Sequence, residues 1–315
     1  YQPYELALSS KMVEIVEKYQ LEVLHVHYAI PHAYAAFMAK QMLKEKGISV
    51  KVVTTLHGTD ITLVGSHPTY KTAVEFSINN SDVVTAVSND LKKTTNRLFN
   101  IKNDIQVIYN FIDTDKYDKS HQQKCNRIAI AKPHERIVTH ISNFRPVKRV
   151  EDVIKVFYKV QKEIPSKLLL IGEGPDRAKA ENLVNKLKIS DDVLFFGNSS
   201  EVTKILCYSD IFLLPSQTES FGLAALEAMA AKTAVISTNT GGLPEVNIQG
   251  VTGYLSDLGD IEDMAKNAIS ILKDDATLEI FKENAREHTK RFSLENILPV
   301  YEEIYKSCYK SKVKS

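Results

Sequence analysis

The stretch "DIFLLPSQTESFGLAALEAMAA" (residues 210–231) contains a predicted strand, a loop and a helix in one run. Gly222 stands at the predicted start of the helix, where it lets the backbone come close to a ligand. The N–H groups of the first turn, near Gly222, Leu223 and Ala224, combine with the helix dipole to form an anion site. The run therefore predicts a strand–loop–helix unit whose loop binds a negatively charged group.

Two carboxylates flank this predicted anion site. Glu219 comes just before the helix, and Glu227 lies within it among apolar residues. A buried carboxylate needs a polar partner. Two carboxylates on either side of a phosphate site suit a nucleotide sugar, which carries hydroxyls at both ends of its diphosphate. The spacing alone also permits a helix-capping role for Glu219 and a surface position for Glu227.

The rest of the chain repeats the alternation of apolar runs and helical periodicity. Alternating strands and helices are typical of βαβ units with parallel sheets. We therefore predict an α/β fold of two Rossmann-like domains, with ligands at the carboxyl ends of the strands. The predicted strands are 22–27, 50–56, 82–87, 105–110, 136–142, 167–172, 192–197, 210–215 and 233–238.

A polar, weakly periodic segment divides the chain at residues 113–136 and reads as an interdomain linker. We predict an N-terminal domain over 1–125, a C-terminal domain over 134–292, and a last helix over 293–315 that returns to the N-terminal domain. The N-terminal domain has four predicted strands, fewer than such sheets normally have, and the chain starts at Tyr1 directly in a helical pattern. We expect that a preceding segment is missing.

Composition excludes several classes of protein. The 315 residues include 40 basic and 39 acidic side chains, a balance that argues against nucleic-acid binding. No run of 18 apolar residues predicts a membrane span. The three cysteines are far apart and form no CxxC or Cys/His cluster, which predicts neither a disulfide framework nor a zinc site and favours a cytoplasmic setting.

A second cluster of charge follows the predicted strand 136–142. Arg145, Lys148 and Arg149 crowd a strand-to-helix loop in "SNFRPVKRVEDV" (142–153). A guanidinium and an ammonium together suit a diphosphate. The alternative is a solvated basic turn, to which Arg149 in particular can belong.

Two glycine-rich loops follow other strands. "LLLIGEGPDR" (168–177) is an incomplete dinucleotide signature whose Gly172 and Gly174 can simply serve a tight turn. "NTGGLPE" (239–245) ends at Glu245, which can reach the same site. Both loops support a ligand site without defining it.

Histidines gather at two strand ends of the N-terminal domain. "TTLHGTDIT" (54–62) contains His57 and Asp60, and His57 can bond a sugar hydroxyl or simply a loop carbonyl. His25 and His27 share one face of a strand, but no third metal ligand has suitable spacing, so we expect a packing role for both. Tyr28, which follows them, is a candidate for the wall of the ligand site.

The motifs together resemble the retaining GT-B glycosyltransferases of family 4. The resemblance rests on the E-x7-E pair in "ESFGLAALE", on "GEGP", on "NTGGLPE" and on the Arg/Lys loop. More narrowly, "HVHYAIPHA", "TTLHGTDIT", "VTAVSNDL", "VIYNFID", "SNFRPVKRVEDVI" and "ESFGLAALEAMA" are similar to bacterial members that join GlcNAc from UDP-GlcNAc to L-malate, the first step of bacillithiol biosynthesis. The likeness runs from about residue 3 to about residue 305.

The resemblance implies a role for each matching residue. It implies that Glu219 holds donor sugar hydroxyls, Glu227 the ribose, and Lys148 with Arg145 the diphosphate, while His57 contacts the sugar near the reacting carbon. Many family members have arginine where this chain has Asn143, which makes the role of Arg145 less secure than that of Lys148. The remaining implied donor contacts are Gly197, Asn198, Ser220, Phe221, Gly222, Leu223 and Ala224, and the possible acceptor contacts are Tyr28, Thr55, Lys71, Tyr109 and Asn110.

The family also implies transfer with retention, no metal or other cofactor, and a possible homodimer. The front-face route that it favours uses the leaving phosphate to take the proton from the malate hydroxyl. Three alternatives remain at this point: another family 4 transferase with a sugar or lipid acceptor, a GT-B UDP-GlcNAc 2-epimerase, and a non-catalytic nucleotide-sugar-binding module.

Overall fold

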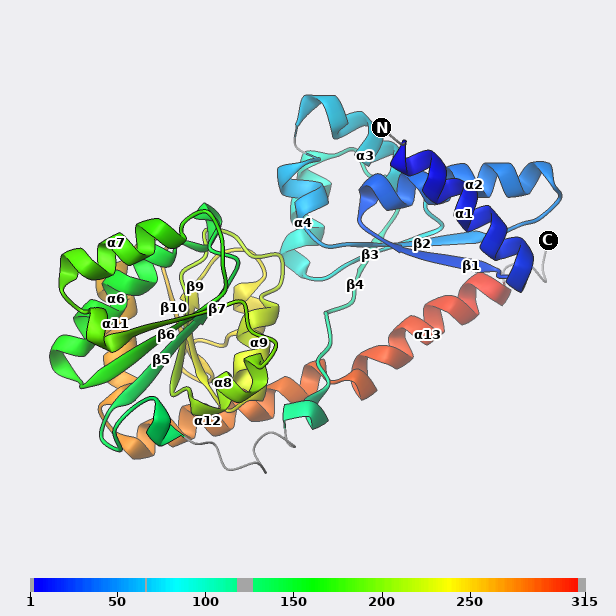
Figure 1. Ribbon diagram of the computed structural model, residues 1–315. Coiled ribbons are helices and arrows are strands. Elements are labelled where there is room, and N and C mark those ends of the chain that lie inside the picture. The colour runs from blue at the N-terminus through cyan, green and yellow to red at the C-terminus, as the bar shows by residue number, and fades with distance from the viewer. Residues whose placement is uncertain (1–2, 66, 118–126, 311–315) are drawn as a thin grey trace. The chain divides into compact units, whose positions relative to one another are not determined.

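The computed structural model describes residues 3–65, 67–117 and 127–310, and the chain forms two α/β units (Figure 1). Unit 1 combines the residues up to 110 with those from 295 onward, and unit 2 spans 111–294. The predicted N-terminal domain ended at 125 and the predicted C-terminal domain spanned 134–292, so unit 2 begins earlier than predicted; residues 118–126 of the predicted linker lie outside the described residues. Both units contain a parallel sheet, so the predicted fold class is confirmed.

Unit 1 is built on a four-stranded sheet in the order β1-β2-β3-β4, with every pair parallel. Its β-branched runs favour extended chain, and the intervening helices return the chain to the same edge. The strands are β1 (Val23–His27), β2 (Lys51–Leu56), β3 (Val83–Ala86) and β4 (Ile105–Val107), and the helices are α1 (Tyr4–Tyr19), α2 (Tyr34–Glu45), α3 (Pro68–Asn79), α4 (Asn89–Leu98) and α13 (Leu294–Lys310).

The two faces of the unit 1 sheet bury alternate residues of β2. Val52 packs with Val26 and Ala36 on the side of α2, while Val53 packs with Ile297 and Ile304 of α13. This alternation with period two is what a strand covered on both faces requires. The C-terminal helix α13 therefore contributes to the core of unit 1.

Unit 2 contains a six-stranded parallel sheet in the order β10-β9-β8-β5-β6-β7. The sequence predicted every strand but β10. The strands are β5 (Arg136–Ile141), β6 (Ser166–Ile171), β7 (Val193–Gly197), β8 (Ile211–Leu214), β9 (Ala234–Thr238) and β10 (Gly253–Ser256), and the helices are α6 (Val150–Glu163), α7 (Arg177–Leu187), α8 (Val202–Tyr208), α9 (Leu223–Ala230), α10 (Leu243–Val246), α11 (Ile261–Leu272) and α12 (Asp275–Thr289).

The strand order of unit 2 reverses between β5 and β8. From β5 the chain moves outward to β6 and β7, then returns to the other side of β5 for β8, β9 and β10. The loops after β5 and β8 therefore leave the sheet in opposite directions. In open parallel sheets ligands bind at such a switch point, beyond the carboxyl ends of the strands.

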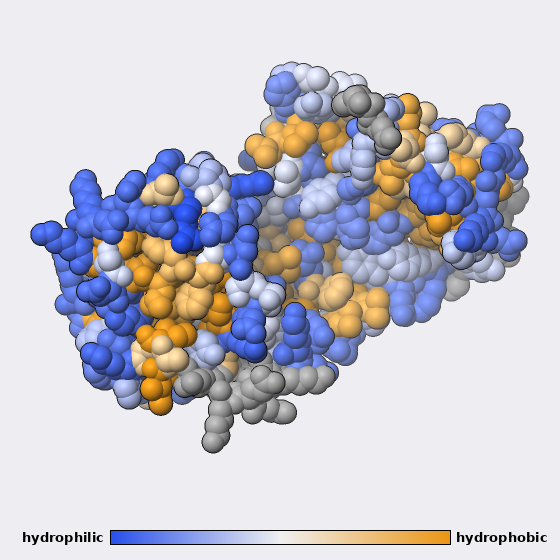
Figure 2. Space-filling view, in the orientation of Figure 1, coloured by the Kyte–Doolittle hydropathy of each residue, from blue (hydrophilic) through white to orange (hydrophobic). Residues whose placement is uncertain are grey.

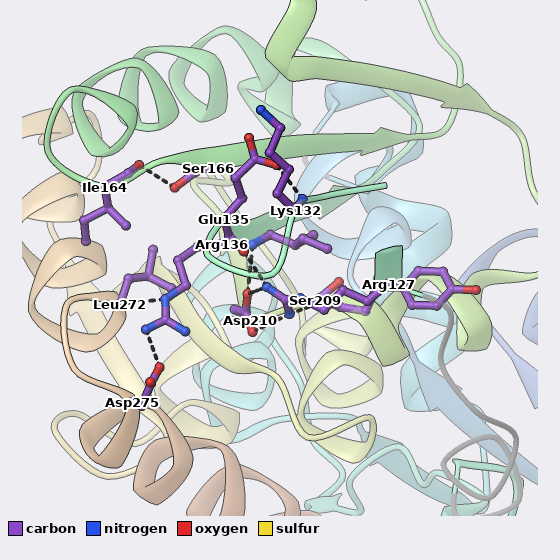
Figure 3. A network of polar contacts seen from close by, with 12 residues as sticks. Arg127, Lys132, Glu135, Arg136, Ile164, Ser166, Ser209, Asp210, Leu272 and Asp275 are labelled. Carbon is purple, nitrogen blue, oxygen red and sulfur yellow. Dashed lines mark hydrogen bonds and ion pairs between the residues drawn. The ribbon is translucent and has the colours of Figure 1, made fainter. Parts of the chain in front are cut away.

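A polar network lies at the amino-terminal edge of this sheet, opposite the carboxyl ends of the strands (Figure 3). It holds the segment that begins at Arg127 against the sheet. Arg127 donates from both terminal nitrogens to buried Asp210, at 3.0 and 2.8 Å, and also to the carbonyl of Glu135 at 2.6 Å. Asp210 in turn accepts from Ile137 N–H at 2.8 Å. Because all its partners are protein groups, we assign this carboxylate a structural role.

Hydrophilic residues cover most of both units in the view of Figure 2, with apolar residues reaching the surface in patches. Within the described part of the chain, no helix has the length and apolar character needed to cross a bilayer. Cys207 is disulfide-bonded, so the expectation of no disulfide is wrong for this residue, and Cys308 is a free, buried thiol.

Candidate active site

The loops after β5 and β8 meet at the switch point of unit 2. The N–H of Gln217 donates to the carbonyl of Val147 at 2.8 Å and fixes the two loops side by side. Lys148 ends a 3-10 turn (Pro146–Lys148), and its Nζ lies 2.5 Å from Oε1 of Glu219. The structure thus brings together the cation and the carboxylate that the sequence predicted as ligand-binding groups.

Glu219 is held from two sides. Ser216, which is fully buried, donates its hydroxyl to the same Oε1 at 2.8 Å. The exposed fractions of the side chains are 14% for Glu219 and 23% for Lys148, so both charges are largely, though not wholly, removed from water. A half-buried carboxylate with a cation and a hydroxyl at one oxygen is preorganised to receive donors at the other.

The glycine pair of "NTGGLPE" supports the loop that carries Glu219. Gly241 has a φ of +59°, and a Cβ there would stand 2.1 Å from the carbonyl oxygen of Glu219. The next residue, Gly242, donates its N–H to that same oxygen at 2.8 Å. The glycines therefore serve close backbone packing, while Glu245 is half-buried in the short helix α10.

The "GEGP" loop packs closely against the backbone of the loop after β5 and supports it. A Cβ on Gly174 would stand 1.9 Å from the carbonyl oxygen of Asn143, and Asp176 N–H donates to the carbonyl of Phe144 at 2.9 Å. Gly172 N–H donates to the carbonyl of Gly197 at 2.8 Å, which extends the contacts to the end of β7. Adjacent loops are thus joined along the carboxyl edge of the sheet.

A buried histidine lies beneath the loop after β5. His140 donates from Nδ1 to the carbonyl of Leu213 at 2.8 Å, and its Nε2 accepts from the Ser142 hydroxyl at 2.8 Å. Since a carbonyl can only accept, this arrangement fixes the neutral tautomer. Burial lowers the pKa of His140 to about 4, and the charge of nearby Lys148 lowers it further in the same direction.

The two arginines of the basic loop differ in their surroundings. Arg145 is exposed and precedes the 3-10 turn, whereas Arg149 has a left-handed backbone and donates from Nε to Asp152 at 2.5 Å. Arg149 is thereby neutralised within its own helix start, while the Arg145 side chain lies in solvent. Of the two, Arg145 is the one available to an incoming anion.

The first turn of α9 has the geometry of an anion site. Gly222 caps it with a φ of +102°, and the first bond of the helix runs from Leu226 N–H to the Gly222 carbonyl at 3.1 Å. The N–H groups of Leu223 and Ala224 therefore precede the helical ladder. Phe221 is buried beneath the turn, Ser220 is half-buried, and Leu223 is 47% exposed.

Glu227 lies on α9 in a half-buried position. Burial raises the pKa of its carboxyl, and the nearby Lys116 opposes that effect. Tyr117 is buried, and its phenol pKa is raised first by burial and then by the charge of Glu227. Glu227 is therefore a half-buried carboxyl that lies near Lys116.

Gly197 and Asn198 end β7 at the far side of the sheet from β8. Asn198 is exposed, and Gly197 has a φ of +64°; a Cβ added there would stand 3.0 Å from Oε1 of Glu173. Glu173 accepts from Arg177 at 2.6 Å. The structure places these residues two strands from Lys148 along the same edge.

In unit 1, the histidines at the ends of β1 and β2 form hydrogen bonds with each other and their neighbours. His27 Nδ1 lies 2.8 Å from His57 Nε2, and His25 bonds Tyr305 through Nδ1 at 2.6 Å and Thr55 through Nε2 at 2.8 Å. His27 is exposed, and its ring stacks on that of His25 with centroids 4.8 Å apart. Burial, with the neighbouring imidazoles, lowers the pKa of His57 to about 4.

The five predicted acceptor residues lie in three parts of unit 1. Tyr28 is 36% exposed with its ring 5.0 Å from that of His57, and the hydroxyl of Thr55 is buried between His25 and Thr85. Tyr109 and Asn110 follow β4, which is three strands from β1 and two strands from β2, or about 14 and about 10 Å by strand spacing. The Tyr109 hydroxyl accepts from Asn89 at 3.1 Å, and Lys71 is exposed on α3.

Ser216, Tyr117 and His27 were not predicted from the sequence as parts of these sites. Ser216 sits three residues before Glu219, a spacing that a loop can bring into contact, but no motif marks it. Among the described residues, no group of three or more His, Cys, Asp or Glu side chains has the geometry of a metal site.

Two family descriptions match the chain. Residues 123–288 match the Glycosyl transferases group 1, and residues 1–116 match Glycosyltransferase Family 4. The N-acetyl-alpha-D-glucosaminyl L-malate synthase of Bacillus anthracis is 47% identical over 306 residues, which are 97% of this chain and 80% of that protein.

Solved structures share the architecture. A glycosyltransferase from Rickettsia africae superposes with a TM-score of 0.79 at 25% identity, covering 98% of this chain and 83% of that one. Anabaena Alr3699/HepE in complex with UDP gives a TM-score of 0.81 at 18% identity, covering 95% of this chain and 82% of that one. The second likeness concerns the fold alone.

Proposed function

The chain belongs to the group 1 and family 4 glycosyltransferases, and within that family we propose that it transfers N-acetylglucosamine from UDP-GlcNAc to the hydroxyl of L-malate. The transferred group and L-malate are in the name of the Bacillus anthracis relative, and the UDP-linked donor is the one that the sequence resemblance implies. The reaction would be the first step of bacillithiol biosynthesis, as the sequence resemblance implies.

One observation carries the chemical part of this proposal. Lys148 and Glu219 meet 2.5 Å apart at the switch point of the unit 2 sheet, beside the first turn of α9. A diphosphate joined to a sugar offers each of them a replacement partner: phosphate oxygens for the ammonium, and sugar hydroxyl donors for the carboxylate. Charge-assisted bonds of this kind contribute on the order of 1.5–3 kcal/mol each.

The remaining contacts in our proposal are those that the sequence resemblance implies. The N–H groups at Gly222, Leu223 and Ala224 face the diphosphate, Glu227 binds the ribose, and Gly197 with Asn198 lies by the uracil. Arg145 adds a second positive charge from solvent. We assign His57 to the sugar near the reacting carbon, with Tyr28 beside it toward the acceptor.

We propose a front-face transfer with retention that uses no metal. The bond from the anomeric carbon to the β-phosphate oxygen breaks, and the malate hydroxyl oxygen bonds to that carbon on the same face. The hydroxyl proton passes to the leaving phosphate, so that atoms and charge balance. Lys148 and Arg145 stabilise the charge that grows on the phosphate, and preorganised charge of this kind is usually the largest catalytic contribution.

A product assay by mass spectrometry tests the proposal. The protein is offered UDP-GlcNAc or UDP-glucose, each with L-malate, inositol phosphate or water alone. We expect N-acetylglucosaminyl malate and UDP from the first pair only. Release of an epimerised sugar without malate would indicate an epimerase, and donor binding without turnover on any acceptor would indicate a binding module.

A further inference from the structure

The hydroxyl of Ser216 has no task in the proposed transfer, although it contacts a residue that does. Ser216 follows β8 and is fully buried, and its Oγ donates to Oε1 of Glu219 at 2.8 Å. The ammonium of Lys148 lies at the same oxygen, at 2.5 Å. Within the part of the chain that the structure describes, the side-chain contacts of Glu219 all fall on Oε1. The second oxygen, Oε2, therefore remains for a hydrogen-bond donor of the ligand.

The peptide unit between Ser216 and Gln217 is fixed from both sides. Its carbonyl accepts from the hydroxyl of Thr238, the last residue of β9, at 2.7 Å, and from that of Thr240 at 3.2 Å. Its N–H, on Gln217, donates to the carbonyl of Val147 at 2.8 Å. Ser216 and Thr238 are both completely buried. Residues at the ends of β9 and β5 thus hold the backbone of Ser216, so its hydroxyl oxygen occupies a fixed place.

Lys148 is a more mobile partner of Glu219. Its ammonium is carried on a flexible aliphatic stem, and 23% of its side chain is exposed. In the proposed reaction this ammonium turns to the phosphate oxygens of the donor, and its contact with Oε1 of Glu219 weakens or breaks. The contact from Ser216 does not depend on the phosphate and stays in place.

A glutamate that loses its anchor can swing away from the sugar. Its side chain has several rotatable bonds, so a single orientation requires contacts that survive ligand binding. A displacement of about 1 Å at a reacting group can lower the rate about 100-fold. A partner that remains on Oε1 therefore keeps Oε2 directed at the donor sugar.

We infer that Ser216 is a positioning residue for the transfer: its hydroxyl holds Oε1 of Glu219 while Lys148 exchanges that oxygen for the donor diphosphate. This inference rests on the proposed function and adds a residue that acts through Glu219. No covalent bond changes in this step. Loss of the hydroxyl should lower kcat, because Glu219 contacts the sugar as it is transferred. The KM for the donor should change little, because Lys148 and the first turn of α9 still bind the diphosphate.

Ser209 offers a matched control at the other end of the same strand. It precedes β8, is 2% exposed and lies in the network at the amino-terminal edge of the sheet (Figure 3). Its hydroxyl is hydrogen-bonded to that of Thr139 at 2.5 Å and to the carbonyl of Ile205 at 3.2 Å. Ser209→Ala therefore removes the hydrogen bonds of a buried serine at the edge of the sheet away from Glu219.

Kinetics on the full chain test the inference. Formation of N-acetylglucosaminyl malate is followed by mass spectrometry for Ser216→Ala and Ser209→Ala, each with and without Glu219→Ala. We expect Ser216→Ala to lower kcat about 10- to 100-fold, with less than about a threefold change in the KM for UDP-GlcNAc. In protein that already carries Glu219→Ala, assayed with enzyme in excess, Ser216→Ala should change the rate less than about twofold, because no carboxylate is left to position. Ser209→Ala should leave the rate within about twofold in both proteins.

Ser216→Cys separates the hydrogen bond from the packing. A thiol fills the space of the hydroxyl but is a weak donor, so this variant should fold and lose kcat nearly as Ser216→Ala does. An equal loss from Ser216→Ala with and without the Glu219 carboxylate would overturn the inference alone, as would a kcat within about threefold of wild type in both Ser216 variants. Wild-type protein that forms no N-acetylglucosaminyl malate would contradict the proposed function, and the inference with it.

Discussion

The ammonium of Lys148 lies 2.5 Å from Oε1 of Glu219, and this ion pair joins the loops after β5 and β8 at the point where the strand order of unit 2 reverses. Two charges of opposite sign that satisfy each other in this way remain in place without a ligand. They can also exchange partners when a ligand offers a phosphate and a hydroxyl.

Lys148→Met should lower kcat/KM for the donor by about 100- to 1000-fold, because the growing charge on the leaving phosphate loses its main cation. Steady-state release of UDP measures the effect. Arg149→Met is the matched control: that cation already pairs with Asp152, so we expect less than about a threefold change. Equal losses in the two variants would mean that the Lys148 contact has no special role.

Glu219→Gln and Glu227→Gln should affect different kinetic constants. Glu219 lies beside Lys148, so its loss should lower kcat, whereas loss of Glu227 should chiefly raise the KM for the donor. Burial raises the pKa of Glu227, which means that its ionised form is held at a cost. We therefore expect Glu227→Gln to raise the Tm in thermal denaturation. A lower Tm would contradict this reading.

Gly241→Ala should impair both stability and turnover. Its φ of +59° disfavours a side chain, and the added Cβ would meet the carbonyl oxygen of Glu219 at 2.1 Å. We expect a loss of more than about 2 kcal/mol in unfolding free energy and at least about a tenfold drop in kcat. Gly250→Ala is matched in conformation, with a φ of +70° and no atom within 4 Å of the new Cβ, and should lose only about 1 kcal/mol.

Stability should fall as the pH is lowered from about 6.5 toward about 4. The folded pKa of His140 is about 4 and its unfolded value about 6.5, so in this window the unfolded chain binds more protons. Urea denaturation should show a loss of about 2 kcal/mol from this residue between about pH 6.5 and pH 5. His140→Gln should be less stable near neutrality but lose less on acidification; an unchanged slope would contradict the assignment.

Arg127→Ala should destabilise the protein without changing its chemistry. It would leave the Asp210 carboxylate buried, with Lys282 at 3.9 Å as its remaining cation, at a cost of about 2–4 kcal/mol. Arg136→Ala removes a neighbouring arginine whose ionic partner, Asp275, is exposed, and should cost about 1 kcal/mol (Figure 3). Denaturation measures both costs, and kcat at a temperature where both variants are folded should match wild type; a lower kcat would show that the network reaches the site.

The sequence alone determined the class of fold and the order of its parts. Val52 and Val53 face opposite sides of the sheet because side chains alternate along a strand, and Gly222 precedes α9 because its backbone has a positive φ. Both features depend only on residues that are close in the sequence. For the same reason the strand–loop–helix unit around Glu219 was predictable. β10 was missed because its four residues between a turn and a polar loop leave little periodicity to detect.

Only the tertiary structure decided which side chains meet. Lys148 and Glu219 are 71 positions apart, and His27 and His57 are 30 apart; each pair forms because neighbouring parallel strands end at the same edge. Sequence spacing carries no information about strand order, and so could not show that Lys148 meets Glu219, whereas Arg149 pairs with Asp152 three positions on. A parallel sheet brings distant loops together, and the physical identity of the site lies in that juxtaposition.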